Sequence, residues 1–266
     1  MPNPAPGFKK NPNRIVRLEP SPRRVRVKFG DEWIADSTNT VLMYETGHLP
    51  VYYFPMRDVR LELMQPTSHE SYCQYKGHAS YWSIKAGDRE SVNAVWAYQT
   101  PYDEMTAINL QDYCAFYWER VDHWFEEDEE VFAHPRDPYK RVDALPSSRP
   151  VRVILGGVAI ADTTNALFLF ETGLPTRFYI PASDVRMELL VESATTSICP
   201  YKGKAKYFSA EIAGVSFPDI AWVYPQPIPE CQKVGNLICF YNEQVDAIFI
   251  DGAEIDKTTM KFYRGD

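Results

Sequence analysis

The sequence predicts a mainly β protein made of two tandem, homologous domains with few short helices. Thirteen glycines and 21 prolines interrupt the 266 residues, about once every eight residues, which favours many short strands over long helices. Apolar residues alternate with cations in 25–29, as on a half-buried strand. The segment 73–77, Cys-Gln-Tyr-Lys-Gly, recurs 126 positions later as 199–203, Cys-Pro-Tyr-Lys-Gly. We therefore expect two related domains, packed with approximate two-fold symmetry.

The duplication continues on both sides of this Cys-x-Tyr-Lys-Gly motif. The matching segments are Val-Arg-Val (25–27 and 151–153), Ala-Asp (35–36 and 161–162), Glu-Thr-Gly (45–47 and 171–173), Asp-Val-Arg (58–60 and 184–186), and Trp-x-Tyr (96–98 and 222–224). After a contraction of two residues, Phe-Tyr at 116–117 matches Phe-Tyr at 240–241. A solenoid repeat spans roughly 20–50 residues, so this much longer period indicates duplication of a whole domain.

Composition shifts divide the chain into five segments. We predict a basic N-terminal arm over 1–21, a first β repeat over 22–130, a linker rich in proline and charge over 131–147, a second β repeat over 148–254, and a C-terminal tail over 255–266. The arm has no strand or helix period, so we expect it to be extended and partly ordered by packing. The linker carries Arg, Tyr and Lys, and we expect it to dock on the body.

Within the first repeat the strand signals follow one another at short intervals. Predicted strands cover 25–29, 32–36, 41–44, 51–54, the alternating segment from residue 58, 79–84, 96–98 and 116–117. The segment 41–44 is apolar on both faces, which predicts a central strand buried on both sides. The second repeat gives the same signals in the same order.

Charge and cysteine usage limit the partners. The net charge is −8, which disfavours binding to nucleic acid or acidic membranes. Residues 1–30 carry eight Lys or Arg against Glu19, and 126–130 is an acidic run; we expect the basic segment to lie solvated near that run. Five cysteines without a Cys-x-x-Cys pair argue against a disulfide framework and a four-thiolate zinc site. No apolar run approaches the ~18 residues that span a bilayer. We therefore expect a cytoplasmic protein.

Several motifs occur together and in order in the second repeat. They are Glu-Thr-Gly-Leu-Pro (171–175), Ile-Pro-x-x-Asp-Val (180–185), Cys-Pro-Tyr-Lys-Gly-x-Ala-x-Tyr (199–207), Trp-Val-Tyr (222–224), Phe-Tyr-Asn-Glu-x-Val-Asp (240–246) and Asp-Gly (251–252). This set resembles the domain-of-unknown-function family 427 in its tandem form, sometimes labelled nucleotidyltransferase-like, over residues 22 to 254. The resemblance implies a small all-β domain similar to the β-tent or Mss4-like fold, in which two sheets join at an angle.

The sequence departs from what the resemblance implies at several points. Relatives of that fold commonly hold a structural zinc with two Cys pairs, which this chain lacks, so we predict no metal and no cofactor. A Gly-rich phosphate loop and a paired-Asp motif are absent, so the nucleotidyltransferase label has no support. The first repeat has Gln74 in place of Pro200, and His48 looks inserted before Leu49-Pro50.

The motif turn holds the main catalytic candidates, Lys202 and Tyr201, with Glu171 nearby. A turn, unlike a strand, lets neighbouring Tyr and Lys side chains face one cleft. A desolvated lysine there has a lowered pKa and serves as a base, a Schiff-base amine or an anion clamp. The alternative is a structural turn in which Lys202 is solvated. Glu171 has either a raised pKa or a local backbone cap, as does Glu45.

The remaining candidates would bind the ligand. They are Trp222, Tyr224, Arg186, Tyr75, Lys76, Trp96 and Tyr98. Each Trp-x-Tyr pair lines one sheet face, where it forms an aromatic wall or simply core. Arg186 is an anion clamp, or a surface partner of Glu188 on the same strand face. All five histidines precede residue 148, so chemistry in the second repeat would proceed without imidazole, and Cys199 is best interpreted as a core thiol.

These features favour a protein that binds a small, partly apolar organic molecule in an aromatic-lined cleft. An enzymatic version would be a metal-free isomerase, cyclase or lyase that uses acid–base chemistry. The alternative is a non-catalytic protein-interaction module that uses the acidic run and the arm, and a nucleotide-processing enzyme is a more remote one. A homo-oligomer is an open alternative. If only one repeat is active, the second is the better candidate because it keeps the full motif.

Overall fold

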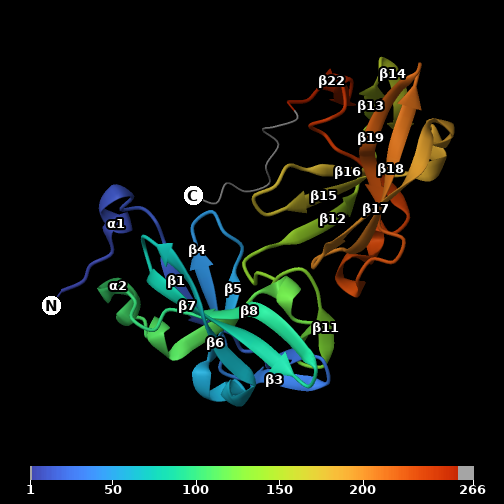
Figure 1. Ribbon diagram of the computed structural model, residues 1–266. Coiled ribbons are helices and arrows are strands. Elements are labelled where there is room, and N and C mark those ends of the chain that lie inside the picture. Colours follow the sequence, from blue (N-terminus) through green and yellow to red (C-terminus); the bar gives the residue numbers. More distant parts are fainter. Residues whose placement is uncertain (1, 257–266) are drawn as a thin grey trace. The chain divides into compact units, whose positions relative to one another are not determined.

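The computed structural model describes residues 2–256, and it divides into two compact units, Met1–Pro135 and Arg136–Asp266. Each unit contains a seven-stranded and a four-stranded antiparallel sheet, so the prediction of a mainly β protein with two tandem domains is confirmed (Figure 1). Within residues 2–256, no helix has the length and apolar character needed to cross a membrane. Most of the tail predicted for 255–266 lies outside the described residues.

The first unit has the strand orders β1-β4-β5-β9-β8-β7-β6 and β11-β10-β2-β3. The large sheet comprises β1 (Val16–Pro20), β4 (Val41–Glu45), β5 (Val51–Pro55), β6 (Met64–Cys73), β7 (Gly77–Ala86), β8 (Arg89–Ala97) and β9 (Tyr113–Phe116). The small sheet comprises β2 (Val25–Phe29), β3 (Glu32–Ser37), β10 (His123–Glu126) and β11 (Glu129–Val131).

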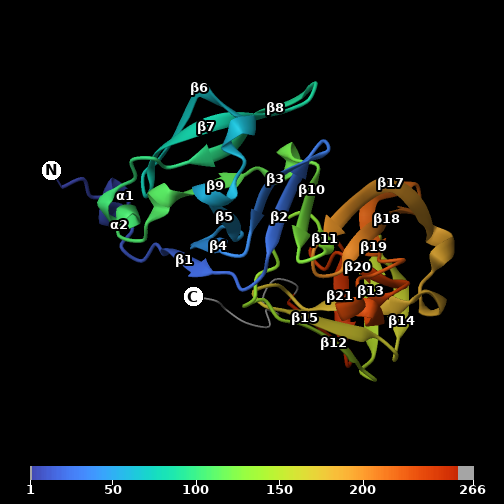
Figure 2. The same cartoon turned by 90° about the horizontal axis from the view of Figure 1, so that it is seen from below.

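The second unit repeats this arrangement with the orders β12-β15-β16-β20-β19-β18-β17 and β14-β13-β21-β22 (Figure 2). The large sheet comprises β12 (Val142–Pro146), β15 (Leu167–Glu171), β16 (Arg177–Pro181), β17 (Leu190–Cys199), β18 (Gly203–Ile212), β19 (Val215–Val223) and β20 (Leu237–Phe240). The small sheet comprises β13 (Val151–Leu155), β14 (Val158–Thr163), β21 (Ala247–Ile250) and β22 (Ala253–Glu254).

Helical elements within the described residues are short. The α-helices are α1 (Pro6–Lys10) and α2 (Asp103–Thr106). The 3-10 helices are η1 (Met56–Asp58), η2 (Leu61–Leu63), η3 (Leu110–Asp112), η4 (Trp118–Arg120), η5 (Ala182–Asp184), η6 (Met187–Leu189) and η7 (Pro229–Val234).

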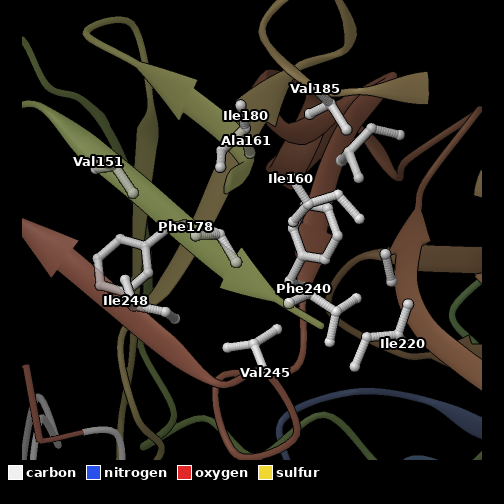
Figure 3. Packing of buried hydrophobic residues seen from close by; sticks show 14 of the residues in the cluster. Val151, Ile160, Ala161, Phe178, Ile180, Val185, Ile220, Phe240, Val245 and Ile248 are labelled. Atoms are coloured by element: carbon white, nitrogen blue, oxygen red, sulfur yellow. The ribbon is translucent and has the colours of Figure 1, made fainter. Parts of the chain in front are cut away.

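The two sheets of each unit enclose a hydrophobic core. Because successive strand residues point to opposite faces, Leu42 and Phe54 of the large sheet pack with Val27 of the small sheet. The second unit has the equivalent core, in which Phe178 and Ile160 are buried together with Ile248 (Figure 3).

The large sheet of each unit also buries apolar side chains on its other face. Val41 and Met43, which alternate with Leu42, join Tyr53 and Ala115 in a second cluster there. The prediction that 41–44 is buried on both sides is therefore confirmed. This second face carries the candidate site described below.

The predicted arm and linker each contribute the first strand of their unit. β1 pairs with β4 in the register Val16↔Glu45, and β12 pairs with β15 in the register Val142↔Glu171. Each strand ends at a proline after only two inward-facing apolar positions, which is too short for a periodicity to be detected. The predicted arm and linker are thus equivalent parts of the repeated fold. In the linker, the Asp137 N–H also donates to the Tyr201 hydroxyl at 2.7 Å.

The basic N-terminal residues do lie against the acidic run. Arg23 forms an ion pair with Glu126, and Arg26 contacts Asp128 at 2.8 Å. The backbone N–H of Arg24 donates to the Glu127 carboxylate at 2.9 Å. Opposite charges of one domain therefore neutralise each other. The expected proximity is present, but Glu126 is buried rather than solvated.

The alternation from residue 58 does not form a strand, which corrects the sequence prediction. Residues 56–58 form η1 and 61–63 form η2, and the strand begins at Met64. β6 is mostly polar and exposed, so its sequence lacks the apolar alternation that would have revealed it. The predicted surface ion pairs are nevertheless present, with Arg60 at 2.7 Å from Glu62 and Arg186 at 2.8 Å from Glu188.

Candidate functional site

The Cys-x-Tyr-Lys-Gly motif forms the turn of a β-hairpin in both units. Strands β6 and β17 end at the motif cysteine, and β7 and β18 begin at its glycine. The glycines have left-handed φ angles, 104° at Gly77 and 107° at Gly203. Residues with a side chain adopt such angles only with strain. A Cβ at Gly203 would also lie 3.2 Å from the Gln226 carbonyl oxygen. This backbone geometry directs the preceding lysine over the second face of the large sheet.

Each motif lysine binds the glutamate that ends an apolar strand of the same unit. Lys76 Nζ lies 2.6 Å from Glu45 Oε2, and Lys202 Nζ lies 2.5 Å from Glu171 Oε2. In the sheet order, β4 and β7 are separated by β5, β9 and β8, so the pair joins the two sides of the face. Such a contact cannot be read from local sequence.

A second cation contacts the other oxygen of each glutamate. Arg14 lies 2.6 Å from Glu45 Oε1, and Lys140 lies 3.6 Å from Glu171 Oε1. These cations come from the predicted arm and linker, at the same spacing of 126 residues as the lysines. Each site is therefore a carboxylate between two cations, with the tighter second contact in the first unit.

We call each glutamate with its two cations a triad, and burial and charge together set the pKa values of its members. The side chains of Lys202 and Glu171 are only 9% and 7% exposed. Burial favours a lower pKa for Lys202, but the charge of Glu171 outweighs this and raises the pKa above its ordinary value. Burial favours a higher pKa for Glu45, but Lys76 and Arg14 outweigh it and hold the pKa below its ordinary value. Lys202 is therefore protonated and Glu45 ionised at neutral pH.

These observations correct two sequence predictions. A lysine with a lowered pKa, suited to act as a base or Schiff-base amine, was one interpretation of Lys202, and the pKa shift has the opposite direction. Glu45 has neither a raised pKa nor a local cap, because its carboxylate is held by Lys76 and Arg14. The sequence could not reveal these distant partners.

Aromatic side chains form a wall beside each triad. Trp96 Nε1 donates to the Tyr53 hydroxyl at 3.1 Å, and Trp222 Nε1 donates to the Tyr179 hydroxyl at 3.2 Å. A further tyrosine packs on each indole, with ring centroids 4.5 Å apart in the first unit and 4.6 Å apart in the second, from Tyr117 and Tyr241 respectively. The walls present flat apolar faces whose polar atoms are already hydrogen-bonded.

Phenol groups edge both walls. Tyr81 OH lies 2.7 Å from Ser71 Oγ and 3.4 Å from Tyr117 OH, and Tyr207 OH lies 2.8 Å from Ser197 Oγ. Burial, reinforced by the hydrogen bond with Tyr81, raises the pKa of Tyr117 to about 12. The Tyr117 phenol is thus neutral at physiological pH and can donate a hydrogen bond to a ligand.

These side chains line a cleft in each unit. The first has a volume of about 820 Å³, and the second about 220 Å³. Residues at equivalent positions in both clefts are Glu45 and Glu171, Lys76 and Lys202, Tyr53 and Tyr179, Tyr81 and Tyr207, Trp96 and Trp222, Tyr98 and Tyr224, and Tyr117 and Tyr241. Concave, aromatic surfaces with a few convergent polar groups are typical of small-molecule sites.

The structure brings together most of the residues predicted from sequence. Lys202, Glu171, Trp222 and Tyr224 line the second cleft, and Tyr75, Lys76, Trp96 and Tyr98 line the first.

Tyr201 and Arg186 lie elsewhere. The Tyr201 hydroxyl binds the Asp137 backbone, and burial raises the pKa of Tyr201 to about 12. Arg186 pairs with Glu188 at the surface. The turn therefore points Lys202 into the cleft and Tyr201 toward the segment that precedes β12.

Sequence reasoning missed several lining residues. They are Arg14, Tyr53 with Tyr179, and Tyr81 with Tyr207; Lys140, the counterpart of Arg14, contacts Glu171 without lining the second cleft. Each pair has the constant spacing of 126, which a position-by-position alignment of the repeats would have revealed. The same alignment corrects the interpretation of His48, because Val41↔Tyr53 and Leu167↔Tyr179 pair in equivalent registers. The two loops have equal length, so His48 replaces Leu174 and is not an insertion.

Metal-binding capacity is limited among residues 2–256. No group of three or more His, Cys, Asp or Glu side chains in this range is placed to hold an ion. The five cysteines are free thiols. Burial raises the pKa of Cys231 to about 11, so its thiol is protonated and a poor ligand at neutral pH.

The family model described as "Domain of unknown function (DUF427)" matches residues 17–127 and 143–251. The chain belongs to the DUF427 family. Both matches fall on the duplicated β domains, and each includes the strand pairs that carry one cleft. A search of curated proteins found no match.

Proposed function

We propose that the DUF427 domains of this chain bind a small, partly apolar organic molecule that carries one negative charge. The observation that carries the proposal is the buried Lys–Glu pair beneath an aromatic wall, present in both domains. A buried ion pair stabilises a fold little, and often less than apolar residues of equal volume would. Its presence in both copies therefore favours a role in recognition.

The charge balance of the clefts supports an anionic ligand. In the first, Arg14 and Lys76 oppose Glu45, which leaves one excess positive charge. In the second, Lys202 and Lys140 oppose Glu171 in the same ratio, and the charge of Arg177, which also lines this cleft, is balanced by Glu243. An anionic group would approach the cations, while a planar or apolar body would lie against the Trp and Tyr rings.

The protonation states favour binding over covalent catalysis. A protonated Lys202 donates hydrogen bonds but is not a nucleophile, since an amine attacks only in its neutral form. In an enzymatic version of the proposal, Lys202 would donate a proton and Glu171 would accept one, in metal-free isomerisation, cyclisation or elimination. That version requires a ligand that separates the pair.

The protein-interaction alternative is less well supported. The acidic run already pairs with cations of the same domain, Arg23 with Glu126 and Arg26 with Asp128. In the arm, Arg14 pairs with Glu45. A concave site next to Lys202, rather than a flat sheet face, also favours a small ligand.

Thermal-shift screening of the full chain tests the proposal. The library would contain aromatic and aliphatic carboxylates, their uncharged amides, and nucleotides. A carboxylate that binds should stabilise the protein by about 2.7 kcal/mol at a concentration of 100 times its Kd, and its amide should stabilise it less.

The matched variants are Lys76→Met with Lys202→Met, and Lys85→Met with Lys204→Met at exposed positions as the control. The first pair should lose the shift and the second should keep it. Equal shifts in both, or no stabilising compound, would contradict the proposal, and stabilisation by nucleotides alone would favour the nucleotide alternative.

A further inference from the structure

The two clefts share their triads and their aromatic walls but differ almost fourfold in volume, about 820 Å³ against 220 Å³. One lining position differs strongly in side-chain size and charge. Val51 pairs with Met43 in the first domain, and Arg177 pairs with Leu169 at the equivalent register of the second. Both side chains line their clefts.

Arg177 extends over the aromatic wall of the second cleft. Its guanidinium carbon lies 5.7 Å from the Trp222 ring centroid and 5.9 Å from that of Tyr241. Two parallel hydrogen bonds of 2.8 and 3.0 Å tie the guanidinium to Glu243. A bidentate pair that also stacks on aromatic rings is held in one orientation, so Arg177 occupies space that a ligand would need.

In the first domain the arginine that packs on the aromatic wall is Arg120, and it lies in a different place. Arg120 lies over the Tyr117 ring at 4.6 Å, and its Nη1 donates to the carbonyl oxygens of Val92 and Asn93. These backbone bonds hold Arg120 at the rim, outside the residues that line the cleft. Val51 is too short to reach across the wall, so the face of the first cleft stays open.

We infer that Arg177 is a specificity-determining residue that restricts the second cleft to small ligands, whereas the first cleft accepts a larger planar anion. This inference rests on the proposed function for the identity of the ligand, but the difference in access does not depend on it. Cys73 and Cys199 line the two clefts at equivalent positions and provide a direct readout. The other three cysteines are buried.

The first experiment measures thiol alkylation in the full chain by peptide mass spectrometry. The ratio of the rate with N-(1-pyrenyl)maleimide to the rate with iodoacetamide reports on access by a bulky group. We expect this ratio to be about tenfold lower at Cys199 than at Cys73, and Arg177→Val should remove the difference, because a thiol reacts according to its access. An unchanged ratio at Cys199 in Arg177→Val would overturn the inference.

The reciprocal variant Val51→Arg should lower the ratio at Cys73. Glu119 stands at the position equivalent to Glu243 and is available as a partner for the new guanidinium. Circular dichroism would establish that each variant folds. If Val51→Arg does not fold, Arg177→Val alone decides the outcome.

The second experiment measures binding stoichiometry by calorimetry with benzoate and 1-pyrenecarboxylate. Wild type should bind benzoate at two sites and pyrenecarboxylate at one, and Arg177→Val should bind pyrenecarboxylate at two. Equal stoichiometry for both probes in wild type would overturn the size difference while leaving the proposed function intact. Failure of both probes to bind, together with the expected alkylation pattern, would contradict the proposed function and leave Arg177 as the residue that controls access.

Discussion

The two domains both keep the Lys–Glu pair and the aromatic wall of the cleft, whereas only the first has a buried charge in its core. In the first core the Tyr52 hydroxyl donates to Glu126 at 2.9 Å, and Glu126 also binds Arg23. Phe178 and Ile250 take the positions of Tyr52 and Glu126 in the second. The second domain thus lacks a buried charge in its core and retains one in its cleft.

The aromatic packing of the cores differs in the same way. Trp118 stacks on Trp124 with ring centroids 4.2 Å apart in the first domain. The equivalent residues of the second are Asn242 and Ile248, and Asn242 donates to the Thr176 carbonyl at 2.9 Å. Cores tolerate such exchanges when volume and pattern are kept. The buried charges of the clefts are present in both domains, although core volume and apolar pattern do not require them. Their presence in both copies therefore indicates a functional role.

The largest expected effect concerns the ion pairs. Lys202→Met should lower the free energy of unfolding by about 3–5 kcal/mol, because it leaves a buried carboxylate poorly compensated. Lys76→Met should cost less, since Glu45 keeps Arg14 at 2.6 Å whereas Glu171 keeps only Lys140 at 3.6 Å. Urea unfolding followed by tryptophan fluorescence would measure both. Adding Glu171→Gln to Lys202→Met should restore part of the loss, and equal losses in the two single variants would remove the proposed difference between the triads.

The motif glycines should rank second. Gly203→Ala should destabilise the protein by about 1–3 kcal/mol, since alanine is strained at a φ of 107° and its Cβ would lie 3.2 Å from the Gln226 oxygen. Gly77→Ala should cost less, because the nearest contact there is 3.5 Å from the Thr100 oxygen. Thermal unfolding monitored by circular dichroism checks the order, and Gly214→Ala, which also has a positive φ but meets no atom within 4 Å, separates strain from contact.

Replacing the Tyr52–Glu126 pair of the first core by the residues of the second should have a smaller effect on stability. Its size depends on whether one residue or both are replaced. Glu126→Ile alone should cost about 1–3 kcal/mol, because it leaves the buried Tyr52 hydroxyl without its acceptor. The double variant Tyr52→Phe with Glu126→Ile copies the second domain and should recover most of that loss. A double-mutant cycle in urea measures the coupling, and additive losses would show that the two cores are not interchangeable at these positions.

The smallest effect is a difference in pH dependence. The pKa of Glu45 is lower in the folded state than its ordinary value of 4.5, so its contribution is present above that value and is lost as the pH falls through the folded pKa. The pKa of Lys202 is raised above 10.5, so its contribution is present below that value and is lost as the pH rises through the folded pKa. Glu45→Gln should flatten the acid limb of the stability profile, and Lys202→Met the alkaline limb. A profile that neither variant alters would contradict both assignments.

Much of the candidate site could be predicted because its residues occur in both copies of the duplicated domain. The repeat identified Lys76 and Lys202, and the i, i+2 spacing placed Trp222 and Tyr224 on one face. Tyr201 was misplaced because the direction of a side chain in a turn depends on the backbone, here on its bond to Asp137. The polar strand β6 was missed because its pairing, rather than its composition, makes it a strand.

The sequence by itself determined the duplication, the strand-rich fold and the burial of 41–44 on both faces, because alternation and repetition are local properties of the chain. Only the tertiary structure decided that Lys202 meets Glu171 across the large sheet, since strands distant in sheet order must converge for that contact. It also placed Arg177 over the aromatic wall of the second cleft, at the register where the first domain has Val51. Packing across a face depends on which strands are neighbours, and that information is not contained in any single segment.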